Sequence, residues 1–268
     1  MYGLCNRKWI LIGGTFMLGI YLSGTGNTKH CIEKLTALLD ENAVVMPLES
    51  EGVIDNIKNN ETIILGYPTQ FSNAPMMFRD FIKSNDIWKD KNVLCVATMG
   101  AFSGDGAGCT ARLLKKKGAN ILGGLHIHMP DSVCDSKLLK KSLDDNKRIV
   151  IDADKKIESV AKDIQNGKYP KQGISFFAHI AGLFGQRLWF YNKTSHYSDK
   201  LKISDECIGC GLCKENCPMN NITIKNKKAF AGNKCTMCYR CISQCPQKAI
   251  TLIGDMVQEQ CQFSKYVS

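Results

Sequence analysis

The feature that most constrains this chain is a cysteine pattern that occurs twice near its C-terminus. The pattern C-x2-C-x2-C-x3-C-P starts at Cys207 and again at Cys235, an offset of 28 residues. The apolar positions behind the two copies also align, Ile222 with Ile250. A segment this short and cysteine-rich leaves little room for a hydrophobic core, so we expect bound metal to supply much of its folding free energy.

The spacing is typical of cysteines that hold cubane iron–sulfur clusters. Three thiolates separated by two residues surround one cluster, and the fourth, beside proline, ligates the cluster of the other copy. Two [4Fe–4S] clusters are therefore predicted. The ligands expected for the first are Cys207, Cys210, Cys213 and Cys245, and those expected for the second are Cys235, Cys238, Cys241 and Cys217.

A zinc site or a set of disulfides would account for these cysteines less well. A zinc ribbon would use C-x2-C pairs, without a third cysteine two residues on or a fourth before proline. A disulfide framework would need an oxidising compartment, and no convincing export signal precedes it. One degraded cluster, or adventitious zinc, stays open as an alternative. The six remaining cysteines are expected to be reduced, which favours the cytoplasm of an anaerobe: Cys5, Cys31, Cys95, Cys109, Cys134 and Cys261.

Length and charge limit the function classes. The 268 residues suit one domain of ordinary size and a smaller second one. The formal net charge is +10, but each oxidised cluster with its four thiolates adds about −2. Lysines and arginines are interleaved with acids rather than gathered in a stripe, so nucleic-acid binding is not expected.

Between residues 17 and 166, apolar runs alternate with segments of helical spacing. The sequence predicts strands at 17–22, 44–48, 62–67, 92–98 and 121–129, and helices at 28–40, 52–59, 75–85, 106–117 and 136–166. This alternation predicts an α/β fold with a doubly wound, five-stranded parallel sheet. Ligands of such sheets bind beyond the carboxyl ends of the strands. His126 and His128, on the fifth strand, are expected to face opposite sides and to have no catalytic role.

The segment after the first predicted strand has the composition of a phosphate-binding loop. It consists of Ser23, Gly24, Thr25, Gly26, Asn27 and Thr28, and a helix follows directly. Backbone N–H groups and hydroxyls can close around a phosphate there, and the helix N-terminus adds partial positive charge. The loop matches neither the Walker A pattern nor the dinucleotide pattern G-x-G-x-x-G.

These motifs together carry a family resemblance. The strand-SGTGNT-helix segment resembles the FMN phosphate loop of flavodoxins, and the cysteine repeats resemble the bacterial two-cluster ferredoxins over about residues 201–255. The whole resembles the flavodoxin–ferredoxin fusion proteins of anaerobes. This resemblance implies FMN, two [4Fe–4S] clusters in a smaller α+β domain, and flavin contacts in two further loops: Pro68, Thr69, Gln70 and Phe71 near N5, and Thr98, Met99, Gly100, Ala101 and Phe102 at the pyrimidine edge.

The resemblance also implies a function, and the sequence itself suggests a domain order. We expect electron transfer between the clusters and FMN and on to a ferredoxin-type redox partner protein, or else an FMN-dependent reductase of a small acceptor such as a quinone or oxygen. The expected order is a non-native extension (1–16), a flavodoxin-like domain (17–166), an apolar helical connector (167–200) and the ferredoxin-like domain (201–268). The connector is expected to pack between domains or in a homodimer interface rather than on a membrane.

Overall fold

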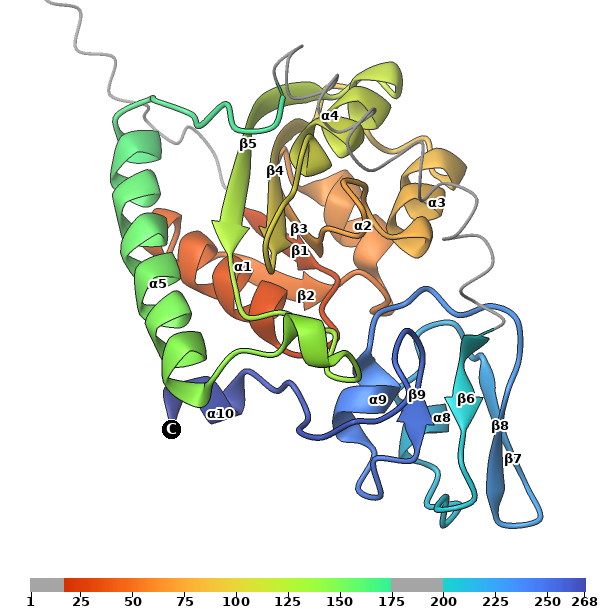
Figure 1. Cartoon of the computed structure of the whole chain (residues 1–268). Helices are drawn as coiled ribbons and strands as arrows, with labels where there is room; N and C mark the ends of the chain where they lie inside the picture. Colours follow the sequence, from red (N-terminus) through yellow and green to blue (C-terminus); the bar gives the residue numbers. More distant parts are fainter. Residues whose placement is uncertain (1–16, 175–199) are drawn as a thin grey trace, which may run out of the picture.

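The computed structural model describes residues 17–174 and 200–268. It has a larger lobe (residues 17–174), a smaller lobe (200–254) and a C-terminal tail (255–268), which are arranged as in Figure 1. The expected extension over residues 1–16 and most of the expected connector, 175–199, lie outside the described residues.

A parallel sheet forms the centre of the larger lobe, as predicted. Its order is β2-β1-β3-β4-β5. The strands are β1 (Leu18–Tyr21), β2 (Val44–Pro47), β3 (Thr62–Pro68), β4 (Asn92–Met99) and β5 (Asn120–His128). Residues 170–172, which the sequence places in the connector, lie beside β5, where Gly124 and Lys171 form an isolated parallel bridge.

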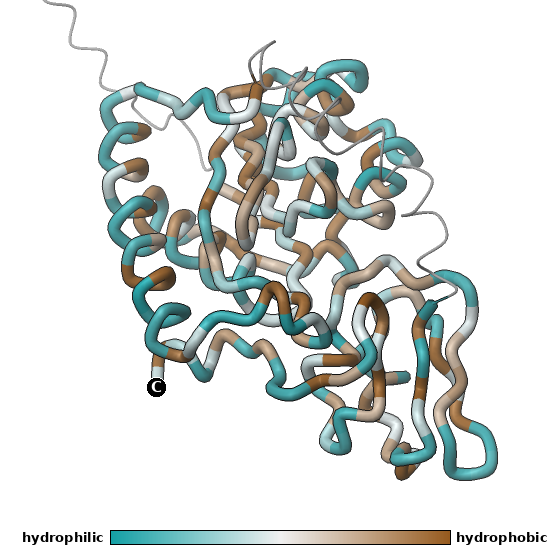
Figure 2. Tube along the Cα trace, in the orientation of Figure 1, coloured by the Kyte–Doolittle hydropathy of each residue, from teal (hydrophilic) through white to brown (hydrophobic). Residues whose placement is uncertain are grey.

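Helices cover both faces of this sheet because its strands are apolar on both sides. Helices α1 (Asn27–Leu39) and α5 (Leu143–Gln165) cover the face that carries Ile64. Helices α2 (Val53–Asn59), α3 (Met76–Ser84) and α4 (Gly106–Lys116) cover the other face, which carries Ile63 and Leu65. Figure 2 shows apolar residues along the strands and on the inner sides of the helices.

The predicted helix over residues 136–166 begins later than expected. A 3-10 turn (Lys137–Leu139) comes first, and α5 starts after Ser142, whose Oγ accepts a 3.1 Å hydrogen bond from the backbone N–H of Asp145. Ser142 is therefore an N-cap, which stops the helix from extending backwards. The other predicted elements differ from the observed ones by about a residue at their ends.

The smaller lobe repeats one unit, as its sequence does. Strand β6 (Lys202–Ile203) pairs antiparallel with β9 (Ile250–Thr251), and β7 (Ile222–Lys225) forms a hairpin with β8 (Lys228–Ala231). The short helices α8 (Leu212–Glu215) and α9 (Arg240–Gln244) contain the third cysteine of the first and second pattern, respectively. This lobe lies below the carboxyl ends of the large sheet in Figure 1.

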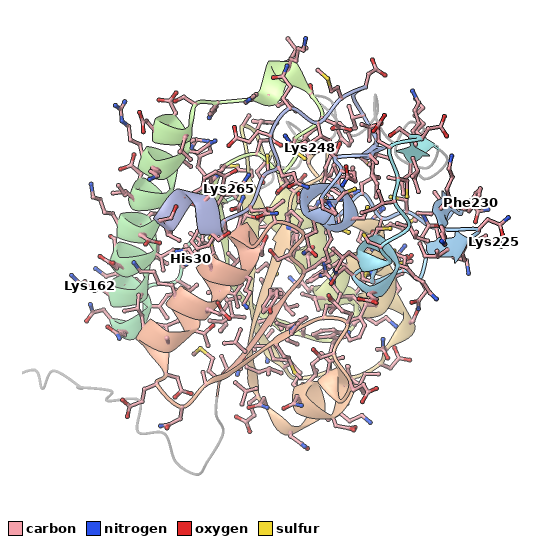
Figure 3. The ribbon with its side chains drawn as sticks, turned by 90° about the horizontal axis from the view of Figure 1, so that it is seen from below. His30, Lys162, Lys225, Phe230, Lys248 and Lys265 are labelled. Atoms are coloured by element: carbon pink, nitrogen blue, oxygen red, sulfur yellow. The ribbon has the colours of Figure 1, made fainter. Side chains whose placement is uncertain are left out.

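The tail then returns to the larger lobe. It ends in α10 (Ser264–Val267), which packs against α5. Just before α10, the backbone N–H of Phe263 donates to the carbonyl oxygen of Thr25 at 2.8 Å, and the Phe263 ring stacks on His30 of α1 with centroids 4.2 Å apart. Figure 3 shows this region from below, with Lys265 of α10 and His30 labelled. Within the described parts of the chain, no helix combines the length and apolarity needed to cross a membrane.

Candidate cofactor sites

The predicted phosphate loop lies at the carboxyl end of β1. Gly26 has a φ of 98°, which suits glycine, and its N–H donates to the Oγ of Ser23 at 3.1 Å. Helix α1 follows with no side-chain cap and no acidic residue in its first turn. Its first N–H groups are therefore available to an anion, and the helix dipole favours negative charge there.

Side chains from three strand ends meet beside this loop. Thr28 Oγ1 lies 2.8 Å from Thr98 Oγ1 of β4, and Thr25 Oγ1 lies 3.1 Å from Ser132 Oγ, which follows β5. The buried Oδ1 of Asn27 has no hydrogen-bond partner among the described residues. A buried acceptor is costly when left unpaired, so this oxygen suits a ligand that carries hydroxyl groups.

A cavity of about 260 Å³ opens at the same edge of the sheet; we call it the inner cavity. It brings together all the residues expected to contact flavin except Gly26: Ser23, Gly24, Thr25, Asn27, Thr28, Pro68, Thr69, Gln70, Phe71, Thr98, Met99, Gly100, Ala101 and Phe102. Its remaining lining was not predicted. Residues 129–133 and Leu139 come from the region after β5, and Met237, Cys238, Tyr239 and Ile253 come from the smaller lobe.

The loop after β3 is strained and touches the smaller lobe. Phe71 and Ser72 have φ values of 49° and 57°, a region that costs a non-glycine residue about 1–3 kcal/mol. Gln70 holds the turn through paired backbone hydrogen bonds with Asn73. The Gln70 side chain donates at 3.0 Å to the carbonyl oxygens of both Thr236 and Met237.

The first set of predicted cluster ligands surrounds a second cavity. Cys207, Cys210, Cys213 and Cys245 all line it. Backbone N–H groups donate to two of the sulfurs at 3.4 Å, from Ala229 to Cys207 and from Ala249 to Cys245. Within residues 17–174 and 200–268 no three His, Cys, Asp or Glu side chains have the spacing of a single-ion site; these cysteines instead form the wall of a cavity.

The electrostatics of this first set fit a cationic centre. Burial, and then the neighbouring Cys207 and Cys245 thiols, raise the pKa of Cys213. Thiols held this close resist ionising together, and bound iron would remove that penalty because metal binding displaces their protons. Hydrogen bonds from backbone N–H to sulfur are one of the features that set a cluster's reduction potential.

The cysteines of the second predicted set also influence one another. Burial, followed by the Cys238, Cys235, Cys217 and Cys213 thiols, raises the pKa of Cys241. The Cys217 sulfur accepts a 3.3 Å hydrogen bond from the N–H of Asn221. Cys217 also acts on the pKa of Cys235 and Cys238, and Cys245 lines one cavity with the first triplet, so the crossed ligation stays a prediction that this arrangement allows.

The phosphate loop and the second cysteine loop touch each other. A Cβ placed on Gly24 would lie 1.6 Å from the carbonyl oxygen of Cys238, so no residue with a side chain fits here without moving one loop. Cys238 also lines the inner cavity. A predicted cluster ligand and the predicted flavin contacts thus share one cavity wall.

The two copies of the cysteine pattern differ where the second meets this cavity. Gly209 and Gly211 of the first copy have positive φ values of 66° and 89°. The corresponding residues of the second copy, Met237 and Tyr239, keep this geometry at 56° and 62° although they carry side chains. Both side chains are buried, and both line the inner cavity.

Asp135, after β5, joins the lobes and was not predicted. Its buried Oδ2 accepts hydrogen bonds from the N–H groups of Leu252 (2.6 Å), Ile253 (3.0 Å) and Gly254 (3.2 Å). Its Oδ1 accepts one from the hydroxyl of Tyr239 at 3.0 Å. Burial, and then the Asp135 charge, raise the pKa of Tyr239, so this hydroxyl remains a donor.

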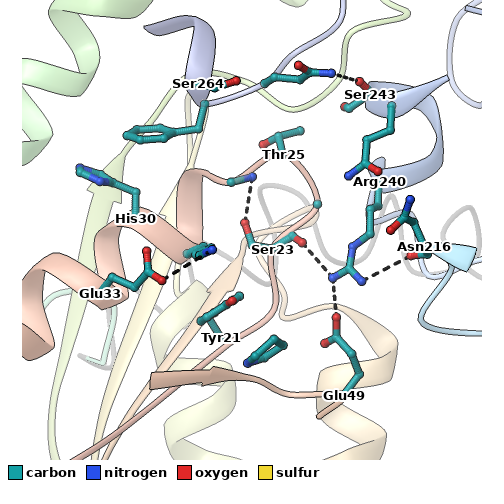
Figure 4. A pocket seen from close by; sticks show the side chains of 17 residues that line it. Tyr21, Ser23, Thr25, His30, Glu33, Glu49, Asn216, Arg240, Ser243 and Ser264 are labelled. Carbon is teal, nitrogen blue, oxygen red and sulfur yellow. Dashed lines mark hydrogen bonds and ion pairs between the residues drawn. The ribbon is translucent and has the colours of Figure 1, made fainter. Parts of the chain in front are cut away.

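A larger cleft lies on the other side of the phosphate loop (Figure 4). Arg240, at the start of α9, reaches across it: its guanidinium donates to the carbonyl oxygen of Ser23 at 3.0 Å and pairs with the Glu49 carboxylate. It also donates to the carbonyl oxygen of Asn216 at 3.4 Å. Arg240 therefore places positive charge between the phosphate loop and the second cysteine set.

The expectation that the two histidines of β5 face opposite sides is wrong. Residues two apart on a strand share a face, and both rings reach the segment after β4. His126 Nε2 lies 3.3 Å from Ser103 Oγ, and His128 Nε2 lies 2.8 Å from the carbonyl oxygen of Gly100. Burial, and then the Lys156 charge, lower the pKa of His126 to about 4, so this ring is neutral at ordinary pH.

Comparisons with known proteins give two family matches. A flavodoxin domain matches residues 18–127, and a 4Fe-4S dicluster domain matches residues 206–249. Similar solved structures include a two-electron reduced flavodoxin from Megasphaera elsdenii, at 20% identity over 55% of this chain and 99% of that chain, with a TM-score of 0.39. Another is a Fusobacterium nucleatum flavodoxin bound to flavin mononucleotide, at 20% identity over 57% and 98%, also with a TM-score of 0.39. A comparison with curated proteins found no match.

Proposed function

Because this chain joins a flavodoxin domain to a 4Fe-4S dicluster domain, the organisation of a flavodoxin–ferredoxin fusion, we propose that it relays electrons between a redox partner protein and FMN through both clusters. It is an electron-transfer flavo-iron-sulfur protein, and its domains imply FMN and two [4Fe–4S] clusters. Each cluster exchanges one electron at a time and FMN can hold two, so the combination can join or split electron pairs.

The residues of this chain have separate tasks in that relay. Ser23 to Thr28 and the N-terminus of α1 hold the phosphate, and the loops 68–71 and 98–102 hold the ring. Cys207, Cys210, Cys213 and Cys245 hold one cluster, and Cys235, Cys238, Cys241 and Cys217 hold the other. The crossed ligation ties the two copies of the pattern together, which keeps the clusters adjacent.

The observation that carries the proposal is the shared wall of the inner cavity. Cys238 lines this cavity together with the phosphate loop, and its carbonyl oxygen leaves no room for a Cβ on Gly24. Electron tunnelling slows steeply with distance, so a cluster held by Cys238 would be the one near enough to exchange electrons with FMN.

The first cluster would then be the one at which the partner protein docks and exchanges electrons. Cys210 is exposed, and the neighbouring Ile208 and Leu212 are 59% and 40% exposed. Exposed lysines of the β7–β8 hairpin lie near this region: the carbonyl oxygen of Lys227 would lie 2.3 Å from a Cβ on Gly209, and Figure 3 labels Lys225 of the same hairpin. Apolar contact ringed by positive charge suits an acidic, ferredoxin-type partner, whose association would slow as salt is added.

Anaerobic purification followed by iron, sulfide and FMN quantitation tests the cofactor assignments. The expected content is eight iron atoms and one FMN per chain. Cys213→Ser should lose iron and keep FMN. Rapid mixing with a reduced acidic ferredoxin should reduce the clusters before FMN, and Cys210→Ser should slow that first step. Equal reduction rates of FMN with and without intact clusters would refute the relay.

A second function is favoured by one observation. Phe102, at the mouth of the inner cavity, is 52% exposed, so a small acceptor could approach the flavin contacts there. An FMN-dependent reductase would turn over quinones or oxygen rapidly at substrate levels, whereas a relay protein would not. Steady-state turnover with a soluble quinone separates the two, and Phe102→Ala should raise that turnover only in a reductase.

A further inference from the structure

Two cysteines outside both ligand sets meet across the junction between the tail and the larger lobe. Cys134 follows β5, one residue before Asp135, and Cys261 lies in the tail, 127 positions later in the sequence. Both side chains line the same small cavity, and each thiol perturbs the pKa of the other.

The pair is sheltered but can be reached. Both cysteines line a small cavity of about 30 Å³, whose rim includes the exposed residues Lys140 and Glu259. The remaining described cysteines outside the ligand sets have different surroundings: Cys31 and Cys95 are fully buried. Cys109 is held by the carbonyl oxygen of Ser72 at 3.4 Å.

The residues on either side of Cys261 connect the tail to the second cysteine loop. Gln260 donates to the carbonyl oxygens of Ile242 and Cys245, at 3.2 and 2.6 Å. Gln262 donates to the carbonyl oxygen of Ser243 at 2.5 Å. The tail at Cys261 is thus hydrogen-bonded to α9 and the residue that follows it, while Cys134 directly follows residues 129–133, which line the inner cavity.

We propose that Cys134 and Cys261 form a reversible disulfide that fastens the cluster-bearing half of the chain to the flavin-binding half under oxidising conditions. The oxidant is a low-molecular-weight disulfide. The Cys134 thiolate attacks it, forming a mixed disulfide and releasing one thiol; the Cys261 thiolate then attacks the Cys134 sulfur and releases the second. The two cysteines lose two electrons and two protons, and the small disulfide becomes two thiols.

The local hydrogen bonding gives the order of these steps. The hydrogen bond between the thiols lowers the pKa of Cys134 and raises the pKa of Cys261. Cys134 is therefore the thiol that ionises first and attacks first. Because both side chains line one small cavity, the second thiol lies on the same side of the junction as the first.

The test uses the anaerobic holoprotein with bis(2-hydroxyethyl) disulfide, a small neutral probe. After exposure, free thiols are alkylated, protein that has kept its iron is isolated, and its peptides are mapped without reduction. The expected product is one cross-linked pair of peptides carrying Cys134 and Cys261, two hydrogen atoms lighter than the free pair, which disappears on reduction.

Matched variants make the result specific. Cys109→Ser should retain the cross-link, whereas Cys134→Ser and Cys261→Ser should each lose it, the remaining cysteine ending as a mixed disulfide. Iron-replete wild-type protein in which Cys134 and Cys261 are both alkylated in full would overturn the proposal. So would a cross-link that joins either of them to a different cysteine.

Discussion

Replacing Asp135 with alanine should detach the segment 252–254 from the larger lobe. The carboxylate accepts four hydrogen bonds, from Leu252, Ile253, Gly254 and Tyr239. Leu252 and Tyr239 are both 4% exposed, so their donors would be left without water, whereas Ile253 is 37% exposed and Gly254 is half-buried, so both of these can be hydrated. Two buried donors without a partner, at about 2 kcal/mol each, would lower the free energy that holds this segment against the larger lobe by about 4 kcal/mol.

Hydrogen exchange, measured by mass spectrometry on samples of equal iron content, reports this loss of stability directly. A loss of about 4 kcal/mol corresponds to amide exchange about 1,000-fold faster in the peptide covering residues 250–254. Asp135→Asn should cost only about 1 kcal/mol, because its amide oxygen can still accept from the backbone while its NH2 group faces the Tyr239 oxygen.

The matched control is Asp86→Ala. Asp86 forms a surface ion pair with Lys117 at 2.5 Å and is 88% exposed, so its removal should leave exchange at 250–254 unchanged. If Asp135→Ala and Asp86→Ala exchanged at the same rate in this peptide, the role given to the Asp135 carboxylate would be wrong.

Three further changes test the sites. Gly24→Ala should leave iron unchanged but slow cluster-to-FMN electron transfer in rapid-mixing experiments, because its Cβ would lie 1.6 Å from the Cys238 carbonyl oxygen. Thr25→Ala with Thr28→Ala should weaken FMN binding by about 2 kcal/mol, about 30-fold, without iron loss, as fluorescence titration can measure. The folded-state pKa of His126, about 4, is below its ordinary 6.5, so the unfolded chain binds more protons between these values. Stability should therefore fall as the pH drops from 6.5 toward 4, by at most about 3 kcal/mol, and His126→Gln should flatten that slope in thermal unfolding.

Features dictated by local chemistry could be predicted from the sequence. Cluster ligation requires a particular cysteine spacing, and a buried parallel sheet requires apolar runs, so both features could be recognised in the sequence. The late start of α5 also had a signal: Ser142 followed three residues later by Asp145 is a capping pattern, but the continuous charged run around it suggested an unbroken helix.

The contacts between the lobes could not be predicted in this way. Asp135 is one acid in a loop, and only its placement opposite the N–H groups of 252–254 gives it a role. Tyr239 and Met237 occupy positions where the first copy has glycine, a difference that becomes meaningful only once their side chains are seen in the inner cavity. Long-range pairing of this kind has no short sequence pattern.

The course of the tail has a consequence for how the two halves relate. Phe263 stacks on His30, and Tyr266, 7% exposed, belongs to the core between α1 and α5. Residues of the tail thus complete the helical layer that covers one face of the sheet in the larger lobe. The two halves consequently cannot be exchanged as independent units. A flavin-binding fragment that ended at residue 174 would expose to water the apolar surface that Phe263 and Tyr266 cover. Replacing everything after residue 200 with another ferredoxin would remove these two side chains from the core of the larger lobe.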